Sequence, residues 1–285
     1  MSEKNRILPS TLYLVATPIG NLSDLSERAI KVLSEVDFIA AEDTRNTAHL
    51  LSYLQIQKPL VSYHEHNKRE RGESICDRLQ SGESCALVTD AGTPAISDPG
   101  EDLVALCAAR GITVTSIPGC CAGITALTLS GLPTGRFCFE GFLSVNKSDR
   151  KKHLDSLKGE TRTMIFHEAP HKLKKTLADM LDIFGPKRKI SLCRELTKLN
   201  EEVIRTTLGG AIALYEEADP RGEYVLVLEG CGKENAPKAF WSEMTVEAHV
   251  EHYLEQGLSR MDAIKQTAKD RGVHKNEIYQ QMLQR

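Results

Sequence analysis

The sequence of 285 residues lacks the short motifs that mark the commonest nucleotide sites. Neither G-x-G-x-x-G nor G-x-x-x-x-G-K-[ST] occurs, which argues against a standard dinucleotide or ATP site. There is no C-x-x-C pair, and the 8 cysteines are scattered through a chain much longer than the small secreted domains that depend on disulfides. We therefore expect most of the cysteines to be buried thiols.

Long apolar runs are also absent. No stretch of about 18 apolar residues occurs, and the start, Met1-Ser-Glu-Lys-Asn-Arg6, has neither the apolar segment nor the cleavage site of a secretion signal. Hydrophobic residues at 41% and charged residues at 26% are typical of a soluble globular protein, and the length allows two α/β domains. The net charge of −3 argues against wholesale coating of nucleic acid but allows a local basic patch. We expect a cytoplasmic protein that does not bind membranes.

Metal-binding patterns are weak. One H-E-x-x-H match, His167-Glu-Ala-Pro-His171, has the spacing of a helical zinc site. Pro170 opposes the continuous helix that would place both histidines on one face. His64 and His66 would project to one side of an extended chain, but no third ligand follows at a recognisable spacing. We expect no metal site.

What the sequence does contain is an unusual loop, residues 89–100, rich in Gly, Pro and small polar residues. The apolar run before it, residues 86–88, predicts a buried strand, and ordinary loops between a strand and a helix have only about 2–6 residues. Ligands of α/β sheets bind beyond the carboxyl ends of strands, and Gly92 would let a ligand approach the backbone. The loop therefore predicts a ligand site. The alternative is that the loop only connects a strand to a helix and binds no ligand, with its two prolines serving its shape.

Strands and helices alternate in two successive halves. Strands are expected at residues 12–16, 37–41, 60–63, 86–88, 111–119, 136–142, 163–167, 189–193, 202–207 and 223–229. Helices are expected at residues 26–35, 46–54, 102–110, 120–130, 171–184 and 208–218. The segment 131–135 breaks the pattern with two glycines and a proline, which predicts domains 1–131 and 132–232.

The remainder, residues 233–285, is expected to be a linker to about residue 241 followed by a helical tail. Gly257 and Gly272 divide the tail into three short helices. From residue 258 onward, six Lys or Arg against three acidic residues give a net charge of +3. Residues 272–279 resemble the start of a recognition helix, so nucleic-acid binding and a packing or dimer contact both stay open. His249 and His252, one helical turn apart, are expected to be solvated.

Other polar segments also follow predicted strands. The loop 17–24 offers exposed amides before a helix, which suit a polar ligand group. The cluster 42–45 is compatible with substrate positioning or with a surface salt pair. Residues 118–122 could form another wall of the ligand site predicted at the loop 89–100. The segment 64–71 is the most polar short stretch, compatible with phosphate or base contacts or with a solvated helix start. Residues 147–152 are expected to be a basic loop.

Eight of these segments, collinear between residues 11 and 230, closely resemble the ribosomal RNA small-subunit methyltransferase I family of the tetrapyrrole-methylase superfamily. They are Val15-Ala-Thr-Pro-Ile-Gly-Asn-Leu22, Ala41-Glu-Asp-Thr-Arg45, Ser62-Tyr-His-Glu-His-Asn67, Thr89-Asp-Ala-Gly-Thr-Pro-Ala-Ile-Ser-Asp-Pro-Gly100, Phe139-Glu-Gly-Phe142, Glu168-Ala-Pro-His171, Arg194-Glu-Leu-Thr-Lys198 and Gly222-Glu-Tyr-Val-Leu226. Their shared order is more specific than any single segment. The tail resembles the family's helix-turn-helix-like extension.

The resemblance implies two α/β domains of the tetrapyrrole-methylase (class III methyltransferase) type. It also implies a homodimer that binds S-adenosylmethionine between the domains, with no metal requirement. The implied reaction methylates the ribose 2′-hydroxyl of a decoding-region cytidine in 16S rRNA, within the small ribosomal subunit.

Cofactor contacts implied by position lie in five loops. They are Pro18, Gly20, Asp90, Ala91, Gly92, Thr93, Ser97, Pro118, Cys120, Cys121, Ala122, Glu168, Ala169, Pro170, Arg194, Leu196 and Thr197. The family's Pro-Gly-x-Ser-Ala loop reads Pro118-Gly-Cys-Cys-Ala122 here, which puts a serine hydroxyl contact in doubt at Cys121. Ser144 stands where the family often has proline after Gly-Phe-Leu.

A ribose hydroxyl is a poor nucleophile, so a base near the reacting oxygen would help. Asp90, at the mouth of the central strand, is our hypothesis for a group that either takes the proton or orients the cofactor. Glu65, His64, Glu168 and Lys198 are the alternatives. RNA contacts are expected at His64, His66, Asn67, Lys68, Arg69, Lys151, Lys152 and Lys275.

Two other functions stay open. A relative in the same superfamily could methylate a tetrapyrrole or a protein side chain, although the polar segment 64–71 and the basic tail argue against this. A non-catalytic RNA-binding factor on a methylase scaffold is the other. Methyl incorporation into small ribosomal subunits tests the first, and calorimetric cofactor binding tests the second.

Overall fold

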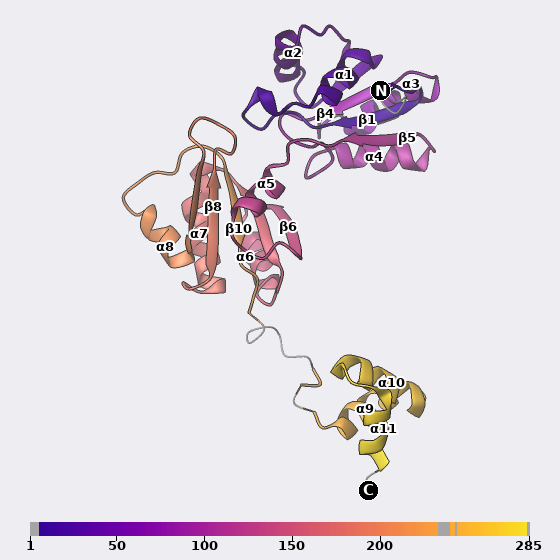
Figure 1. The fold of residues 1–285 in the computed structure, drawn as a ribbon, viewed down its shortest axis with the longest axis vertical. Helices are drawn as coiled ribbons and strands as arrows, with labels where there is room; N and C mark the ends of the chain where they lie inside the picture. Colours follow the sequence, from indigo (N-terminus) through magenta and orange to yellow (C-terminus); the bar gives the residue numbers. More distant parts are fainter. Residues whose placement is uncertain (1–5, 233–239, 243, 284–285) are drawn as a thin grey trace. The chain divides into compact units, whose positions relative to one another are not determined.

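The structure is a computed structural model that describes residues 6–232, 240–242 and 244–283. The chain divides into two compact units, one ending at Gly230 and one beginning at Cys231 (Figure 1). Most of the expected linker, residues 233–239, lies outside the described residues. Within those residues, no helix combines the length and apolar character needed to cross a bilayer.

The first sheet of the first unit is wholly parallel, with strand order β3-β2-β4-β1-β5. Its strands are β1 (Thr11–Val15), β2 (Phe38–Ala41), β3 (Leu60–Ser62), β4 (Cys85–Val88) and β5 (Thr113–Ile117). Because all five run the same way, their carboxyl ends share one edge. The five strands predicted from the apolar runs are confirmed, with ends shifted by at most two residues.

Helices cover both faces of this sheet because its strands are apolar on both. These elements are η2 (Leu22–Asp24), α1 (Glu27–Glu35), α2 (Thr44–Tyr53), α3 (Lys68–Gln80) and α4 (Gly100–Ala109). Side chains alternate between the faces along β1. Val15 packs with Val32 of α1 in one core cluster, whereas Leu12 packs with Ile75 of α3 and Leu103 of α4 in another.

The second sheet has the order β6-β7-β10-β8-β9, in which β6 and β7 are parallel and the other neighbours antiparallel. Its elements are β6 (Phe137–Phe142), α6 (Lys147–Ser156), β7 (Thr163–Glu168), α7 (Pro170–Phe184), β8 (Lys189–Arg194), β9 (Glu202–Thr207), α8 (Leu208–Leu214) and β10 (Tyr224–Leu228). Leu154, Leu177 and Leu208 bring α6, α7 and α8 onto one core. The two α/β layers confirm the predicted fold class.

One helix, α5 (Ala122–Leu129), connects the two sheets in sequence. It lies before the predicted boundary at 131, yet Ala126 and Leu127 pack with Ile165 and Val225 of the second sheet (Figure 1). The division into domains at residues 131 and 232 stays a prediction.

The expectation that residues 147–152 form a loop is wrong, because α6 begins at Lys147. Asn146 caps this helix: its side-chain oxygen accepts hydrogen bonds from the backbone amides of Ser148 (2.8 Å) and Asp149 (3.4 Å). An asparagine cap satisfies amides that have no partner inside the helix. The run of charged residues concealed this start. The helix α8 also ends at Leu214, four residues before its predicted end.

The second unit contains α9 (Val246–Glu255), α10 (Arg260–Arg271) and α11 (Lys275–Leu283), so the three predicted tail helices are confirmed. Val250, Ile264 and Ile278 form the centre of its core. The expectation that His249 is solvated is wrong. Its side chain is fully buried, its ring stacks on Trp241 at 5.6 Å, and its Nε2 lies 3.2 Å from a carboxylate oxygen of Asp270.

Candidate functional site

Three loops of the first sheet meet at its carboxyl edge. The backbone N–H of Thr17, after β1, donates to the oxygen of Gly92 (2.9 Å), and the N–H of Gly92, after β4, donates back to Thr17 (3.0 Å). The hydroxyl of Thr93 donates to the backbone oxygen of Cys120, after β5 (2.8 Å). This is the edge at which α/β sheets bind ligands.

Loops of the second sheet approach the same edge. A Cβ atom built at Gly20 would lie 2.4 Å from Cγ of Lys198 and 3.0 Å from the backbone oxygen of Leu196. A Cβ at Gly141 of β6 would lie 2.9 Å from the hydroxyl oxygen of Ser97. Only glycine therefore fits at either contact between the sheets without displacing its neighbours.

Backbone strain is concentrated in two of these loops. Six non-glycine residues in the described part of the chain have a positive φ, and four of them lie here: Ala95 (66°), Ser97 (62°), Glu195 (51°) and Thr197 (65°). Such conformations persist only where the surroundings enforce them, and they cluster at functional sites. In the loop that contains Ala95 and Ser97, the carboxylate of Asp98 enforces the backbone conformation. It accepts hydrogen bonds from the amides of Ala95 (3.0 Å) and Gly100 (2.7 Å).

A cavity of about 630 Å³ lies among these loops, within the roughly 300–1,000 Å³ usual for small-molecule sites. We call it the cofactor cavity, after the sequence-based expectation that these loops bind S-adenosylmethionine. Its lining residues are Ile19, Glu42, Thr89, Asp90, Ala91, Ala122, Phe142, His167, Glu168, Ala169, Pro170, His171, Cys193, Glu195, Leu196, Lys198, Glu223, Tyr224 and Val225. Both sheets contribute to it.

The cavity lining is acidic. Its described residues include the five carboxylates of Glu42, Asp90, Glu168, Glu195 and Glu223 against one lysine. Lys198 Nζ is 2.9 Å from carboxylate oxygens of both Glu195 and Glu223, and its hydrogen bond holds the pKa of Glu195 below the usual range. The other three carboxylates form no ion pair with a described residue. Their field favours a positively charged ligand.

Two buried polar atoms in or beside the cavity lack hydrogen-bond partners among the described residues, Nε2 of His167 and the hydroxyl oxygen of Thr197. Burial lowers the pKa of His167, whose ring meets Phe139 and Phe142 edge-on at 5.2 and 5.4 Å. Buried polar groups are nearly always paired in native proteins. A polar ligand in the cavity would supply partners, and S-adenosylmethionine, which carries amino, carboxylate and adenine groups, fits this requirement.

The candidate bases differ in availability. Glu168 is buried, and its carboxylate already accepts hydrogen bonds from the amide of Ala169 (2.9 Å) and the hydroxyl of Thr176 (2.5 Å). Lys198 is held by its two glutamates. No described residue donates a hydrogen bond to the carboxylate of Asp90, which lies on the cavity wall. His64 and Glu65 are not among the lining residues.

Seven of the expected cofactor residues line the cavity: Asp90, Ala91, Ala122, Glu168, Ala169, Pro170 and Leu196. Ten others lie in the same five loops without lining it: Pro18, Gly20, Gly92, Thr93, Ser97, Pro118, Cys120, Cys121, Arg194 and Thr197. The cavity also includes residues not expected from the sequence, among them Glu42, His167 and Glu223. Each of these three residues lies within or directly beside one of the eight segments that resemble the methyltransferase family. They come together because the ends of neighbouring strands meet there.

The expected RNA-contact residues fall into three places. Residues 64–69 form the turn before α3 and its first residues, where Lys68 is already paired with Glu65 (2.8 Å) and Asp102 (2.7 Å). Asn67 shapes the turn, because its side-chain oxygen accepts a hydrogen bond from the amide of His64 (2.8 Å). Lys151 and Lys152 are exposed on α6, and Lys275 begins α11 of the other unit.

The H-E-x-x-H match spans a strand and a helix. His167 belongs to β7 and His171 to α7, which begins at Pro170. The two histidines therefore do not share a helix face. In the described part of the chain, no three His, Cys, Asp or Glu side chains are grouped to hold a metal ion.

Comparisons with known proteins define the class. The sequence model of the family described as Tetrapyrrole (Corrin/Porphyrin) Methylases matches residues 11–212. Among solved structures, uroporphyrin-III-C-methyltransferase from Thermus thermophilus is 19% identical with a TM-score of 0.54, covering 77% of this chain and 94% of that one. A cobalt precorrin-4 methyltransferase is 13% identical with a TM-score of 0.56, covering 77% and 95%. The fold is that of the tetrapyrrole methylases, and the chain is a methylase of this class.

Sequence relatives narrow the class to one family. "Ribosomal RNA small subunit methyltransferase I" of Halalkalibacterium halodurans is 52% identical over 98% of this chain and 96% of its own length. The proteins of that name from Bacillus subtilis and Escherichia coli O157:H7 are 48% and 42% identical, over 94% and 96% of this chain and 92% and 94% of their own lengths. The chain belongs to the ribosomal RNA small subunit methyltransferase I family.

Gly20 provides a test of the cavity. We expect Gly20→Ala to weaken S-adenosylmethionine binding about tenfold, because the added methyl group must displace the loop 196–198, and overpacking costs roughly 1–3 kcal/mol. Isothermal titration calorimetry measures the affinity. Gly135→Ala is the matched control, since nothing lies within 4 Å of a Cβ at that position. Equal affinity in both variants would place the ligand away from Gly20.

Proposed function

We propose that this protein transfers the methyl group of S-adenosylmethionine to the 2′-hydroxyl of a decoding-region cytidine in 16S rRNA. The observation that carries the proposal is the acidic cofactor cavity, where the strained loops of both sheets meet. Its chemistry suits a cationic methyl donor. Relatives named as ribosomal RNA small subunit methyltransferases, 42–52% identical over nearly their whole length, support RNA as the substrate.

When bound, S-adenosylmethionine supplies a methyl group activated by a positively charged sulfur. The residues that hold it in this proposal are the seven lining residues expected from the sequence, with Gly20 and Thr197 at their border. The carboxylates of Glu42, which accepts a hydrogen bond from the Thr89 hydroxyl (2.7 Å), and of Asp90 favour the positive charge. Nε2 of His167 and the hydroxyl of Thr197 are available for polar contacts. Phe142 and Tyr224 add apolar surface that excludes water.

Asp90 is the residue we assign to the acceptor hydroxyl. It follows β4, the central strand of its sheet, and no described residue occupies its carboxylate. A carboxylate in this place can accept the hydroxyl proton or hold the hydroxyl in position. Positioning contributes much of the rate in such displacements, and a general base typically adds about 10²–10⁴-fold.

The wider setting is part of the same proposal. We infer that the substrate is 16S rRNA within the small ribosomal subunit, that the enzyme acts as a cytoplasmic homodimer, and that Lys151, Lys152 and Lys275 contact phosphates. These lysines are unpaired with acidic groups in the described part of the chain, which supports the last point.

Methyl incorporation tests the function. Small ribosomal subunits from cells lacking the enzyme, incubated with the protein and tritiated S-adenosylmethionine, should gain one methyl group per subunit. Digestion to nucleosides should then yield labelled 2′-O-methylcytidine. Large ribosomal subunits are the control and should stay unlabelled. Label on a base, on a ribosomal protein or on a tetrapyrrole supplied in parallel would contradict the proposal.

A further inference from the structure

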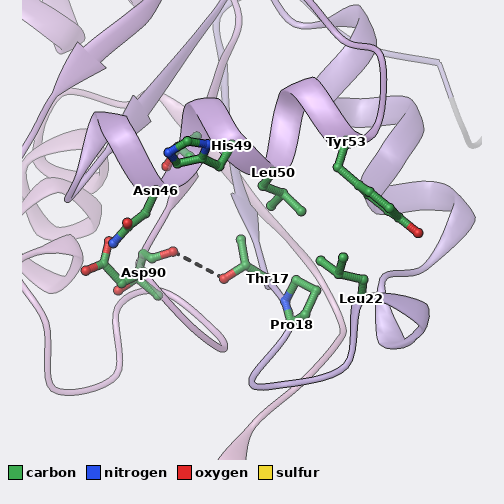
Figure 2. A pocket seen from close by; sticks show the side chains of 10 residues that line it. Thr17, Pro18, Leu22, Asn46, His49, Leu50, Tyr53 and Asp90 are labelled. Carbon is green, nitrogen blue, oxygen red and sulfur yellow. Dashed lines mark hydrogen bonds between the residues drawn. The ribbon is translucent and has the colours of Figure 1, made fainter. Parts of the chain in front are cut away.

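Figure 2 shows a second cavity, of about 290 Å³, which shares two lining residues with the cofactor cavity. Its lining residues are Thr17, Pro18, Leu22, Asn46, Thr47, His49, Leu50, Tyr53, Thr89 and Asp90. We call it the α2 pocket. Thr89 and Asp90 line both cavities, so the carboxylate assigned to the acceptor hydroxyl lies where the two meet.

One face of α2 forms most of the pocket. Asn46, His49, Leu50 and Tyr53 have the spacing i, i+3, i+4, i+7, which places them on a single helix face. In Figure 2, Leu50 and Tyr53 extend from this face toward Pro18 and Leu22. The helix packs into the core through another face, where the buried Leu51 belongs to the same core cluster as Val15 and Val32.

The pocket is built of large side chains that remain accessible. Tyr53 is 65% exposed and Leu22 45% exposed, although both are large and partly apolar. Asn46 and His49 make no side-chain hydrogen bond to any described residue, whereas the Thr17 hydroxyl is held by the backbone oxygen of Thr89 (3.2 Å). The pocket thus combines an aromatic ring, an apolar floor and unused hydrogen-bonding groups.

These features match a nucleobase. Enzymes that act on one nucleotide turn it out of its stack, hold the base against aromatic or apolar side chains and contact its Watson–Crick edge. The Asn46 amide offers a donor and an acceptor side by side, as the cytosine edge requires. The pocket volume lies just below the usual range for small-molecule sites, which suits a single pyrimidine rather than a second cofactor.

We propose that the α2 pocket binds the cytosine base of the target nucleotide, with Tyr53 as a stacking surface and Asn46 at the base edge. Its ribose then lies beside Asp90, between the base and the cofactor cavity. Asn46 and Tyr53 act here as positioning and specificity residues. The inference rests on the proposed function, because it identifies how that substrate is held.

Steady-state kinetics with small ribosomal subunits test the assignment. Tyr53→Ala and Asn46→Ala should each lower kcat/KM for subunits roughly tenfold to a hundredfold, in line with the loss of one base-stacking or base-edge contact. Their affinity for S-adenosylmethionine, measured by calorimetry, should stay within twofold of wild type. Tyr53→Phe keeps the ring and should retain most of the activity. Ser52→Ala, exposed on another face of α2, is the matched control.

A binding measurement separates this inference from the proposed function. Cytidine 5′-monophosphate, titrated by NMR in the presence of S-adenosylhomocysteine, should bind wild type and Tyr53→Phe and bind Tyr53→Ala at least tenfold more weakly. The expected difference in cytidine 5′-monophosphate binding does not depend on whether small ribosomal subunits are the substrate. Equal binding by wild type and Tyr53→Ala would overturn the inference. So would a tenfold loss of S-adenosylmethionine affinity, or a shift in sedimentation from dimer to monomer, in Tyr53→Ala.

Discussion

Asp90→Asn should reduce the turnover of small ribosomal subunits by about 10²–10⁴-fold at saturating cofactor and RNA, the usual contribution of a general base. The substitution keeps the size and shape of the side chain but removes its charge and its capacity to take a proton. No described residue forms a hydrogen bond with this carboxylate, so the substitution should leave no other side chain of the described residues without its hydrogen-bond partner. Single-turnover methyl transfer measures the effect.

Cofactor affinity distinguishes the two roles of Asp90. If the carboxylate acts on the hydroxyl, calorimetry should show S-adenosylmethionine binding to Asp90→Asn within a few-fold of wild type. If it orients the cofactor, affinity should fall while turnover at saturation recovers. Asp24→Asn is the matched control, since Asp24 is exposed at the end of η2 and lines neither cavity. Near-wild-type turnover of Asp90→Asn would remove the base role.

The sequence could predict that the loops of the candidate site meet at one edge of the first sheet, because parallel strands have only one carboxyl edge. Apolar runs predicted β1, β4 and β5, and the loops rich in glycine and proline after them had to meet there. The contact between Thr17 and Gly92 is a direct consequence. For the same reason, three of the residues expected to bind the cofactor, Asp90, Ala91 and Ala122, line one cavity from this sheet.

The second sheet could not be placed in this way. It is mixed, so strands distant in sequence, such as β7 and β10, deliver residues to the same wall. Whether His167 and Glu223 line a cavity depends on which strands pair, and a single sequence does not specify that pairing. The α2 pocket was missed for another reason. The helix face that lines it mixes polar and apolar residues, so the sequence pattern does not show that this face is exposed. The burial of Leu51 in the core shows which face of α2 packs inward.

Burial of polar and charged residues was the hardest feature to predict. Composition placed residues 147–152 in a solvated basic loop, but Arg150 in this run is buried, with a side chain only 4% exposed. His249 in the tail is a second example. Both are buried beside specific acidic partners, Asp179 and Asp270, that lie 29 and 21 residues away in sequence. Long-range pairs of this kind leave no periodic pattern.

Arg150 should be among the residues on which stability depends most. Its Nε donates to a carboxylate oxygen of Asp179 (2.7 Å), and its Nη1 donates to the backbone oxygens of Ser144 (2.9 Å) and Val145 (3.3 Å). The side chain thus connects α6, α7 and the loop that follows Phe142, which lines the cofactor cavity.

Arg150→Met should therefore lower the free energy of unfolding by about 3–5 kcal/mol, because it leaves the largely buried Asp179 without its partner. Urea denaturation measures the change. Lys151→Met, at the exposed neighbouring position, should change stability by less than about 0.5 kcal/mol. In Arg150→Met combined with Asp179→Leu, much of the loss should return, since no unpaired charge remains buried. If Arg150→Met alone unfolds like wild type, the ion pair does not hold this loop.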